Sequence, residues 1–452
     1  MATDRKQKLV DLKAENLADA LLELAAQSGA ADDLVERLIA TPTENIQRFR
    51  KKLAGLKRSR RFIDRRGSFA FARKLAILLQ DLKAGVTDPL AGAKLVAAFY
   101  ETDKGVIGHC DDSDGCVGDV FRYDARELFA EFASSCEDQE KIAAIILKLN
   151  REDDYGVRDS LVDCAGEFLP EPVIRTMITK LQKRADDTED EHQKRHHLML
   201  IESLARQIKD AELFEHTRIA SWGKLSTGAF IDIAGVYLDS GDVQTAYLWL
   251  NKIPENDTFQ PHKRDELLQE IYRQQGDDKK LIELLYRKFR SYHSSTTLQD
   301  LLDIIGNDRR DEIISKEVVL ILANPILRLS DAEFLISVGK IEEAERLILE
   351  RAQQLNGDYY GSLISLAKTM RFENRSLAAT LIYRSLLISI LERGYTKAYR
   401  HGIGYLKKLD KMAPSISRWM KFDNHETFKD QIYLAHGRKH SFWSKYEPNK
   451  SN

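Results

Sequence analysis

Apolar residues recur at intervals of three and four along most of the chain, and alternation with a period of two is nearly absent. Leu17, Leu21 and Leu24 show this spacing near the N-terminus, and Leu75 and Leu78 belong to a second such stripe. The spacing places the apolar side chains on one face of a helix. The pattern therefore predicts an all-α protein made of short amphipathic helices.

One frame of residue types recurs in the C-terminal half. A large apolar residue is followed four positions later by a turn-forming residue, five positions after that by a small or apolar residue, and four positions further by another large apolar residue. The copies are Tyr237, Gly241, Ala246 and Leu250; Tyr272, Gly276, Leu281 and Leu285; Leu335, Gly339, Ala344 and Ile348; and Met370, Asn374, Ala379 and Tyr383.

Two antiparallel helices need such a frame because Gly or Asn can end the first helix in the left-handed conformation. Tyr237 and Tyr272 are 35 residues apart, close to the tetratricopeptide period of about 34 residues. A copy with Leu302 and Gly306 is degenerate, since Asp311 stands where a small residue is expected. The frame favours a right-handed helical-repeat solenoid, and unrelated helical hairpins with shared turn residues are the alternative.

The N-terminal half has a different period. Two sets of residues align at an offset of 40, which is in the range of HEAT-like repeats. The acidic stretch 186–191 is typical of a break between helical modules. We therefore expect a HEAT-like domain at 1–185 and a tetratricopeptide-like domain at 192–452. The aligned residues are Val117, Asp119, Phe121 and Ala125, and then Val157, Asp159, Leu161 and Ala165.

Composition agrees with a folded helical protein. The 452 residues are 43% apolar and 31% charged, and Lys and Arg (69) nearly balance Asp and Glu (71). The longest uncharged stretch, residues 318–327, is too short to cross a bilayer, so no membrane association is expected. The N-terminus lacks a signal-peptide pattern and the chain has four Cys, which favours a cytoplasmic protein without disulfides.

The balanced total hides a strongly basic segment at residues 48–66, which contains one acidic residue, Asp64. Such a segment creates a positive field that attracts nucleic acid or an acidic partner. The alternative is a solvated helix–loop–helix whose Arg stems pack over the surface. Of the nearby Phe49, Phe62, Phe69 and Phe71, most are expected in the core. The ten cations are Arg48, Arg50, Lys51, Lys52, Lys57, Arg58, Arg60, Arg61, Arg65 and Arg66.

No catalytic or metal motif is complete. The stretch 109–116 offers His, Cys and Asp, but it lacks the ligand set of a calcium loop or a zinc site. Its Asp residues are instead expected to cap a helix beginning near Val117. His192, His196 and His197 favour a polar helix face, because Gln193 replaces the Glu of the metalloprotease motif. We predict no catalytic, metal or cofactor site, and favour a protein that is not an enzyme.

The C-terminal segment holds Arg438, Lys439, Phe442 and Trp443. These residues could contact a partner, because cations beside Trp stack well on bases and peptides. The interpretation we prefer is that Phe442 and Trp443 cover the open end of the last repeat.

Several segments together resemble an uncharacterised bacterial helical family, whose members are similar to the region downstream of the zinc finger in SWIM-type proteins. The chain has no Cys-x-Cys pair, so the zinc module of those proteins is missing. The resemblance implies a helical fold and supplies no reaction. The segments that carry it are 61–64 with 71–72, 111–115 with 117–121, 154–156, 377–384, 397–399, and His436 with Lys439, Phe442 and Trp443.

These patterns together predict a non-enzymatic scaffold or adaptor that mediates protein–protein interaction in a bacterial complex, since helical repeats expose long surfaces for partners. A nucleic-acid-binding protein that uses residues 48–66, in a defence or DNA-transaction complex, is the first alternative. A metal-dependent hydrolase or nuclease using acids such as Asp111, Asp112 and Asp114 is the second.

Overall fold

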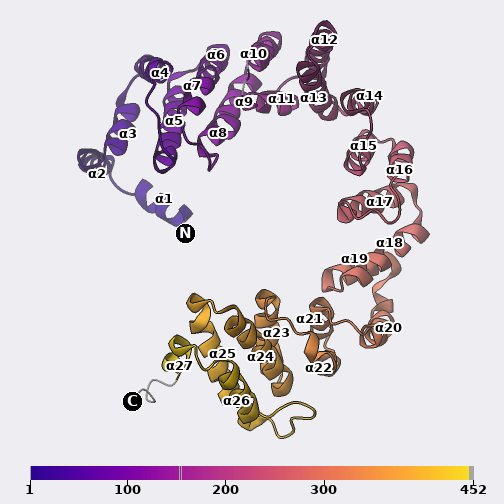
Figure 1. The fold of residues 1–452 in the computed structure, drawn as a ribbon. Coiled ribbons are helices and arrows are strands. Elements are labelled where there is room, and N and C mark those ends of the chain that lie inside the picture. The colour runs from indigo at the N-terminus through magenta and orange to yellow at the C-terminus, as the bar shows by residue number, and fades with distance from the viewer. Residues whose placement is uncertain (1, 152, 154, 447–452) are drawn as a thin grey trace. The chain divides into compact units, whose positions relative to one another are not determined.

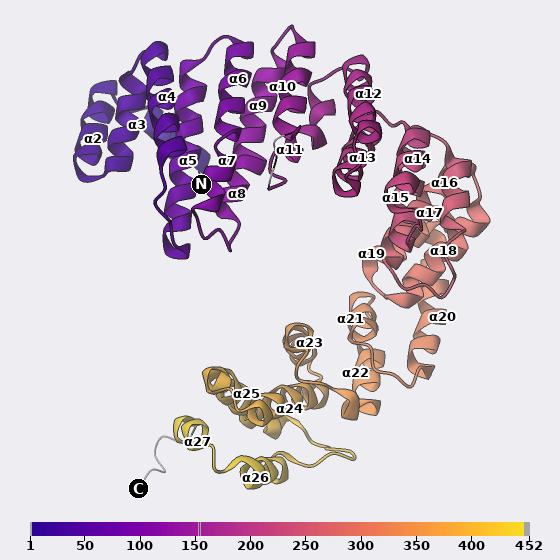
Figure 2. The same cartoon turned by 45° about the horizontal axis from the view of Figure 1, so that its top comes forward.

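The computed structural model describes residues 2–151, 153 and 155–446. Every regular element in these ranges is a helix, and the pairing of Ile63 with Cys110 is an isolated β-bridge. The prediction of an all-α protein is therefore confirmed. Within each unit, Figures 1 and 2 show helices that follow one another in chain order, many of them as neighbouring pairs.

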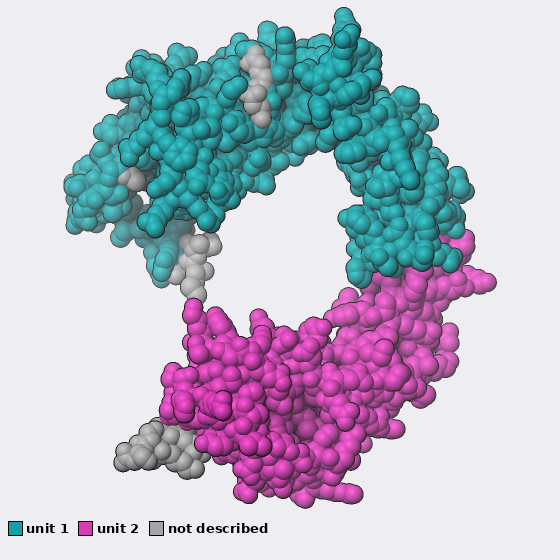
Figure 3. All heavy atoms as spheres, in the orientation of Figure 1, with its two compact units in different colours: residues 1–267 teal, residues 268–452 magenta. Residues whose placement is uncertain are grey.

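The chain divides into two compact units, residues 1–267 and 268–452 (Figure 3). Helix α17 (Pro261–Gln275) contains the division. The helices of the first unit are α1 (Ala2–Val10), α2 (Ala14–Gln27), α3 (Gly29–Ile39), α4 (Pro42–Arg58), α5 (Arg65–Gly85), α6 (Pro89–Tyr100), α7 (Asp103–Gly108), α8 (Cys116–Asp119), η1 (Val120–Ala125), α9 (Arg126–Ser134), α10 (Gln139–Arg151), α11 (Asp159–Asp163), η2 (Ala165–Glu167), α12 (Glu171–Asp187), α13 (Glu191–Gln207), α14 (Ala211–Trp222), α15 (Thr227–Ser240) and α16 (Val243–Leu250).

The second unit continues the same organisation. Its helices are α18 (Asp278–Ser291), α19 (Ser295–Ile305), η3 (Asn307–Arg309), α20 (Arg310–Ala323), α21 (Leu329–Ser337), α22 (Ile341–Glu350), η4 (Ala352–Gln354), α23 (Tyr360–Phe372), α24 (Ser376–Arg393), η5 (Thr396–Ala398), α25 (Tyr399–Met412), η6 (Ala413–Ser415), α26 (His425–His436) and α27 (His440–Tyr446).

Sequential helices pack against each other in both units. In the first unit the neighbours α4 and α5, α12 and α13, and α15 and α16 pack closely, and in the second unit α21 and α22, and α23 and α24 do so. Each unit contains its own cluster of buried apolar side chains. The amphipathic stripes therefore meet across neighbouring helices, because a single short helix cannot bury its apolar face alone.

The turn residues of the C-terminal frame have the predicted left-handed backbone. Positive φ values are found at Gly241 (92°), Gly276 (66°), Gly339 (77°) and Asn374 (59°). After each turn, the next amide donates back to the carbonyl of the large apolar residue that opens the frame, as from Asp242 N to Tyr237 O at 2.9 Å. This is the Schellman ending of a helix. The hairpin frame is thus confirmed locally, while its assignment to a repeat family stays a prediction.

The degenerate copy also differs in structure. Gly306 has a φ of 98° but a ψ of 140°, outside the left-handed helical region, and the short helix η3 follows it directly. The copy that contains Asp311 therefore turns at Gly306 with a backbone geometry that differs from that of the four regular copies.

The acidic stretch 186–191 joins α12 to α13. The Asp190 carboxylate accepts hydrogen bonds from the amides of His192 (2.8 Å) and Gln193 (3.3 Å), so it caps α13. The stretch lies within the first compact unit, whereas the units divide at residue 267. The HEAT-like and tetratricopeptide-like domains stay predictions. Among the described residues, no helix is long and apolar enough to cross a membrane.

Candidate functional site

The basic segment 48–66 forms the end of α4, the connection 59–64 and the start of α5. Thr41 and Glu44 cap α4 reciprocally, and the Asp64 side chain accepts a hydrogen bond of 2.9 Å from the Gly67 amide at the start of α5. Phe49 and Leu53 are buried on α4. Because the apolar stripe fixes how α4 is rotated, Arg50, Lys51 and Arg58 are exposed on the helix.

The connection 59–64 is attached to a loop almost fifty residues further along the chain. The Ile63 amide donates to the His109 carbonyl (2.9 Å), and the Asp111 amide donates to the Ile63 carbonyl (2.8 Å). Arg65 donates two hydrogen bonds to the Asp114 carboxylate, at 2.9 and 2.7 Å. Two of the segments that carry the family resemblance therefore lie side by side and hold the connection in place.

The carboxylates of the 111–114 loop have structural partners. Asp112 accepts hydrogen bonds from the amides of Val117 (2.8 Å) and Gly118 (2.7 Å), which confirms that it caps the helix beginning there. Asp111 binds Ser113, and Asp114 binds Arg65. Among the described residues, no group of three or more His, Cys, Asp or Glu side chains is arranged to hold a metal ion.

Four cations of the basic segment are paired with carboxylates. Arg48 lies within 3.4 Å of Asp33 and 3.2 Å of Glu36. The other three are Lys52 with Asp33 (3.2 Å) and Asp81 (3.1 Å), Lys57 with Glu101 (3.4 Å), and Arg65 with Asp114. These ion pairs attach α4 and α5 to neighbouring helices and loops, as the helix–loop–helix interpretation expects.

The other six cations are exposed and lie within 4 Å of no carboxylate in the described part of the chain. Arg58 and Arg60 donate only to backbone carbonyls, those of Ala54, Lys57 and Ser59. The six, which we call the unpaired cations, are Arg50, Lys51, Arg58, Arg60, Arg61 and Arg66. Their positive charges are therefore available to an anionic partner.

The phenylalanines beside these cations divide into two pairs. Phe49 is fully buried and Phe71 packs against the core, but Phe62 and Phe69 are 63% and 73% exposed. The expectation that most of the four are core residues is therefore wrong for half of them. Phe69 and Leu78 are nine residues apart on α5, and a turn of about 100° per residue places them on opposite sides of the helix.

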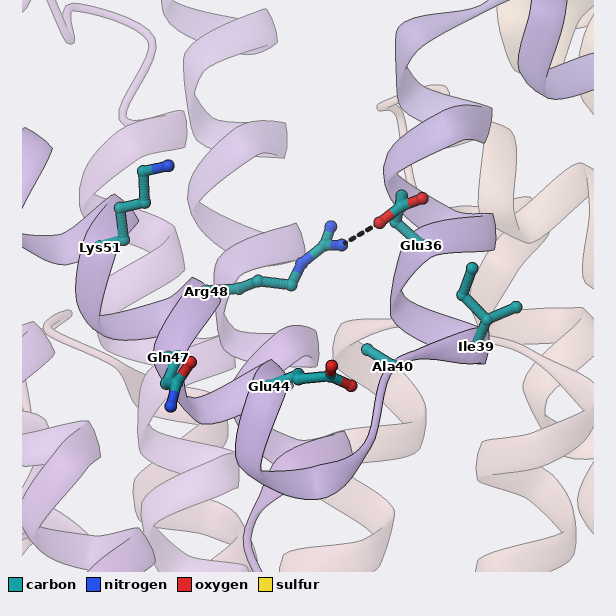
Figure 4. A pocket seen from close by; sticks show the side chains of 7 residues that line it. All are labelled: Glu36, Ile39, Ala40, Glu44, Gln47, Arg48 and Lys51. Atoms are coloured by element: carbon teal, nitrogen blue, oxygen red, sulfur yellow. Dashed lines mark hydrogen bonds and ion pairs between the residues drawn. The ribbon is translucent and has the colours of Figure 1, made fainter.

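A hollow of about 530 Å³ lies between α3 and α4 (Figure 4). Arg48 reaches across it to Glu36 in Figure 4, with a nitrogen–oxygen distance of 3.2 Å, while Lys51 stands apart from this pair. Glu44 also lines the hollow. Because both signs of charge are present and Arg48 is already paired, the hollow itself does not select an anion.

A second hollow, of about 850 Å³, is lined by His192, His196 and His197 of α13. Asp159 faces them, and its carboxylate accepts a 2.5 Å hydrogen bond from Asn150 and lies 3.6 Å from Nε2 of His196. Burial raises the pKa of Asp159 to about 6, although His196 opposes this shift. Burial of the Asp159 carboxylate is the main cause of this shift, and Thr188 also lines the hollow.

At the C-terminus, Phe442 is fully buried and packs edge-to-face against Tyr399 and Trp443. The Trp443 indole donates to the His436 carbonyl at 2.9 Å. Arg438 is exposed and Lys439 is half-buried. The aromatic rings thus lie on the last helices of the second unit, and a partner contact by Arg438 and Lys439 stays a prediction.

Comparison with protein-family models matches residues 2–226 and 174–445 to the family of unknown function DUF6880. The chain belongs to this family. The resemblance to an uncharacterised family is thereby confirmed, while the likeness to SWIM-type proteins stays a prediction. None of the curated proteins matches the chain.

Two features of this DUF6880 chain were missed by sequence reasoning. Arg73 is exposed, lies outside the segment 48–66, and follows Phe69 by four residues, so it shares the outer face of α5. The contact between Asp159 and His196 joins residues 37 positions apart, and no sequence spacing indicates it. The sequence does indicate the exposure of Arg73, because Phe69, four residues before it on the same face of α5, lies outside the leucine stripe.

Proposed function

We propose that this protein is a non-enzymatic helical-repeat scaffold whose first unit binds a polyanionic partner through the unpaired cations. The observation that carries the proposal is that six exposed cations within residues 48–66 have no carboxylate within 4 Å among the described residues, although four others in the same segment do. A local excess of positive charge on a nearly neutral chain attracts a partner of opposite charge.

The proposal includes the finer architecture and setting. The N-terminal half would be HEAT-like and the C-terminal half tetratricopeptide-like, and the protein would act inside a bacterial cytoplasmic complex. Packing between sequential helices and the four free thiols support this view. A likeness to the helical region of SWIM-type proteins belongs to the same proposal.

The test is elution from a heparin column in a salt gradient. Reversing three unpaired cations, in the variant Arg58→Glu, Arg60→Glu and Arg61→Glu, should move elution to markedly lower salt, because phosphate-like and sulfate contacts release counterions. The matched control reverses three exposed lysines elsewhere, Lys180, Lys183 and Lys279. Equal shifts in both variants would mean that net charge alone governs retention, and the proposal would be rejected.

A further inference from the structure

Two exposed phenyl rings stand among the unpaired cations. Phe62 lies in the connection 59–64 directly after Arg60 and Arg61, and Phe69 lies on α5 between Arg66 and Arg73. Exposing rings this far opposes the hydrophobic effect. The same hairpin buries Phe49 fully, so its core can accept a phenyl ring.

The order of residues on α5 places charge and ring on one face. Arg66, Phe69 and Arg73 are spaced by three and four residues, which makes their side chains neighbours on a helix surface. In the described part of the chain, neither Phe62 nor Phe69 stacks on another aromatic ring or lies beneath a cation. Both rings are therefore available to a planar group of a ligand.

We propose that the polyanion bound here is single-stranded nucleic acid, with phosphates on the guanidinium groups and bases stacked on Phe62 and Phe69. This inference rests on the proposed function, since it names the partner of the same surface. An unpaired strand presents its phosphates and the faces of its bases together, which is what a positive surface carrying aromatic rings recognises.

Other polyanions use only half of this surface. In a duplex the bases are stacked on one another, so the cations would bind phosphates while the phenyl rings found no base face. An acidic peptide would satisfy the charge and leave the rings without planar partners. The combination of rings and cations therefore favours a single strand.

The experiment measures fluorescence anisotropy of labelled 20-nucleotide dT and rU strands, a 20-base-pair DNA duplex and a poly-glutamate peptide, each titrated with the full chain. The ring variant is Phe62→Ala with Phe69→Ala. Its control is Phe259→Ala with Phe372→Ala, two rings that are 51% and 82% exposed elsewhere. The cation variant is Arg58→Ala, Arg60→Ala and Arg61→Ala, and circular dichroism confirms that each variant is folded.

We expect the ring variant to weaken single-strand binding at least tenfold, because stacking on one aromatic ring changes affinity by about fivefold or more. Duplex binding and the dependence of log K on log salt should not change. The cation variant should weaken binding to both nucleic acids and lower the salt slope. The control variant should bind as the wild type does.

Three results would overturn the inference while leaving the proposed function standing. These are equal or tighter binding of the duplex, unchanged single-strand binding by the ring variant, and preferential binding of poly-glutamate. The last would identify an acidic protein surface as the partner. Binding of none of the four probes at low salt would reject the proposed function itself.

Discussion

The basic segment of the first unit exposes its charged side chains to solvent, whereas a histidine cluster in the second unit buries them. The unpaired cations of residues 48–66 are exposed, and no carboxylate lies within 4 Å of them in the part of the chain that the structure describes. His293, Glu317 and Asp331 are buried at 6%, 1% and 1% exposure, and each faces a group of opposite charge. Nδ1 of His293 lies 2.7 Å from Asp331, and Nε2 lies 3.5 Å from Glu317, which Arg290 also contacts at 2.8 Å.

The difference follows from solvation. A charge inside a protein loses its water and is tolerated only when a partner replaces that water, whereas an exposed guanidinium keeps its hydration and needs no partner. Phe289 and Phe334 pack on the His293 ring at 4.9 and 5.4 Å, so little water remains there. The histidine cluster is therefore structural, while the unpaired cations are available to a ligand.

Contacts within the cluster also shift the pKa values of His293 and Glu317. Burial alone would lower the pKa of His293, but the hydrogen bond to Asp331 and the nearby Glu317 carboxylate outweigh it and raise the pKa above its usual value. Burial acts to raise the pKa of Glu317, but its ion pair with His293 and the hydrogen bonds that it accepts from Arg290 lower it. Charged histidine and charged carboxylates thus stabilise each other.

The largest loss of stability is expected for His293→Ala, which removes the central cation of the buried cluster. This change leaves two buried carboxylates without their shared cation, so we expect the second unit to lose about 3 to 5 kcal/mol of unfolding free energy. Chemical denaturation followed by circular dichroism measures the loss. Exposed His401 on α25 provides the control, and His401→Ala should unfold as the wild type does. Equal behaviour of both variants would show that the cluster contributes little.

Gly339→Val tests whether the cluster depends on the turn that ends α21, the helix that carries Asp331. Gly339 has a φ of 77°, where a β-branched residue is strained, so we expect a loss of about 1 to 3 kcal/mol. Beyond the two adjacent residues, no described atom lies within 4 Å of an added Cβ, so the expected loss comes mainly from the backbone conformation.

Gly339→Asn is the matched control for this turn. Asn374 occupies the equivalent position of another copy at a φ of 59°, so asparagine is compatible with the conformation. The Asn variant should therefore melt close to the wild type. If valine were tolerated as well as asparagine, the left-handed turn would not be required by the repeat frame.

A smaller effect is expected from pH. Because the folded-state pKa of His293 is raised, its stabilisation is complete below its unfolded pKa of about 6.5 and is lost as the pH rises through the higher folded value. The stability difference between wild type and His293→Gln should thus be larger at pH 6 than at pH 9. Thermal melts at the two pH values measure it. A constant difference would mean that folding does not raise the pKa of His293.

The smallest effect is predicted for Phe69→Ser. The ring is 73% exposed, so removing it takes little apolar surface from the core, and the melting temperature should remain unchanged. Phe49→Ser on the same hairpin should unfold far more easily, since that ring is fully buried. Similar losses for both variants would show that Phe69 is part of the core, and the comparison of exposed and buried positions would fail.

Local features of the fold were predictable because they depend on residues close in sequence. The turn at Gly241 follows from the freedom of glycine at positive φ, and the cap formed by Asp112 follows from free amides at the start of α8. The burial of Phe49 follows from helical spacing. The candidate site was only partly predictable, because the sequence located the basic segment but did not separate its paired cations from its unpaired ones.

The sequence by itself determined that the chain is helical, where several helices end, and where positive charge is concentrated, since each depends on contacts within a few residues. Only the tertiary structure decided that Arg65 meets Asp114, that His293 meets Asp331, and that Phe62 and Phe69 stay exposed. The physical reason is that pairing and burial depend on which helix faces pack together. That packing brings together residues 38 or more positions apart, and no local spacing encodes it.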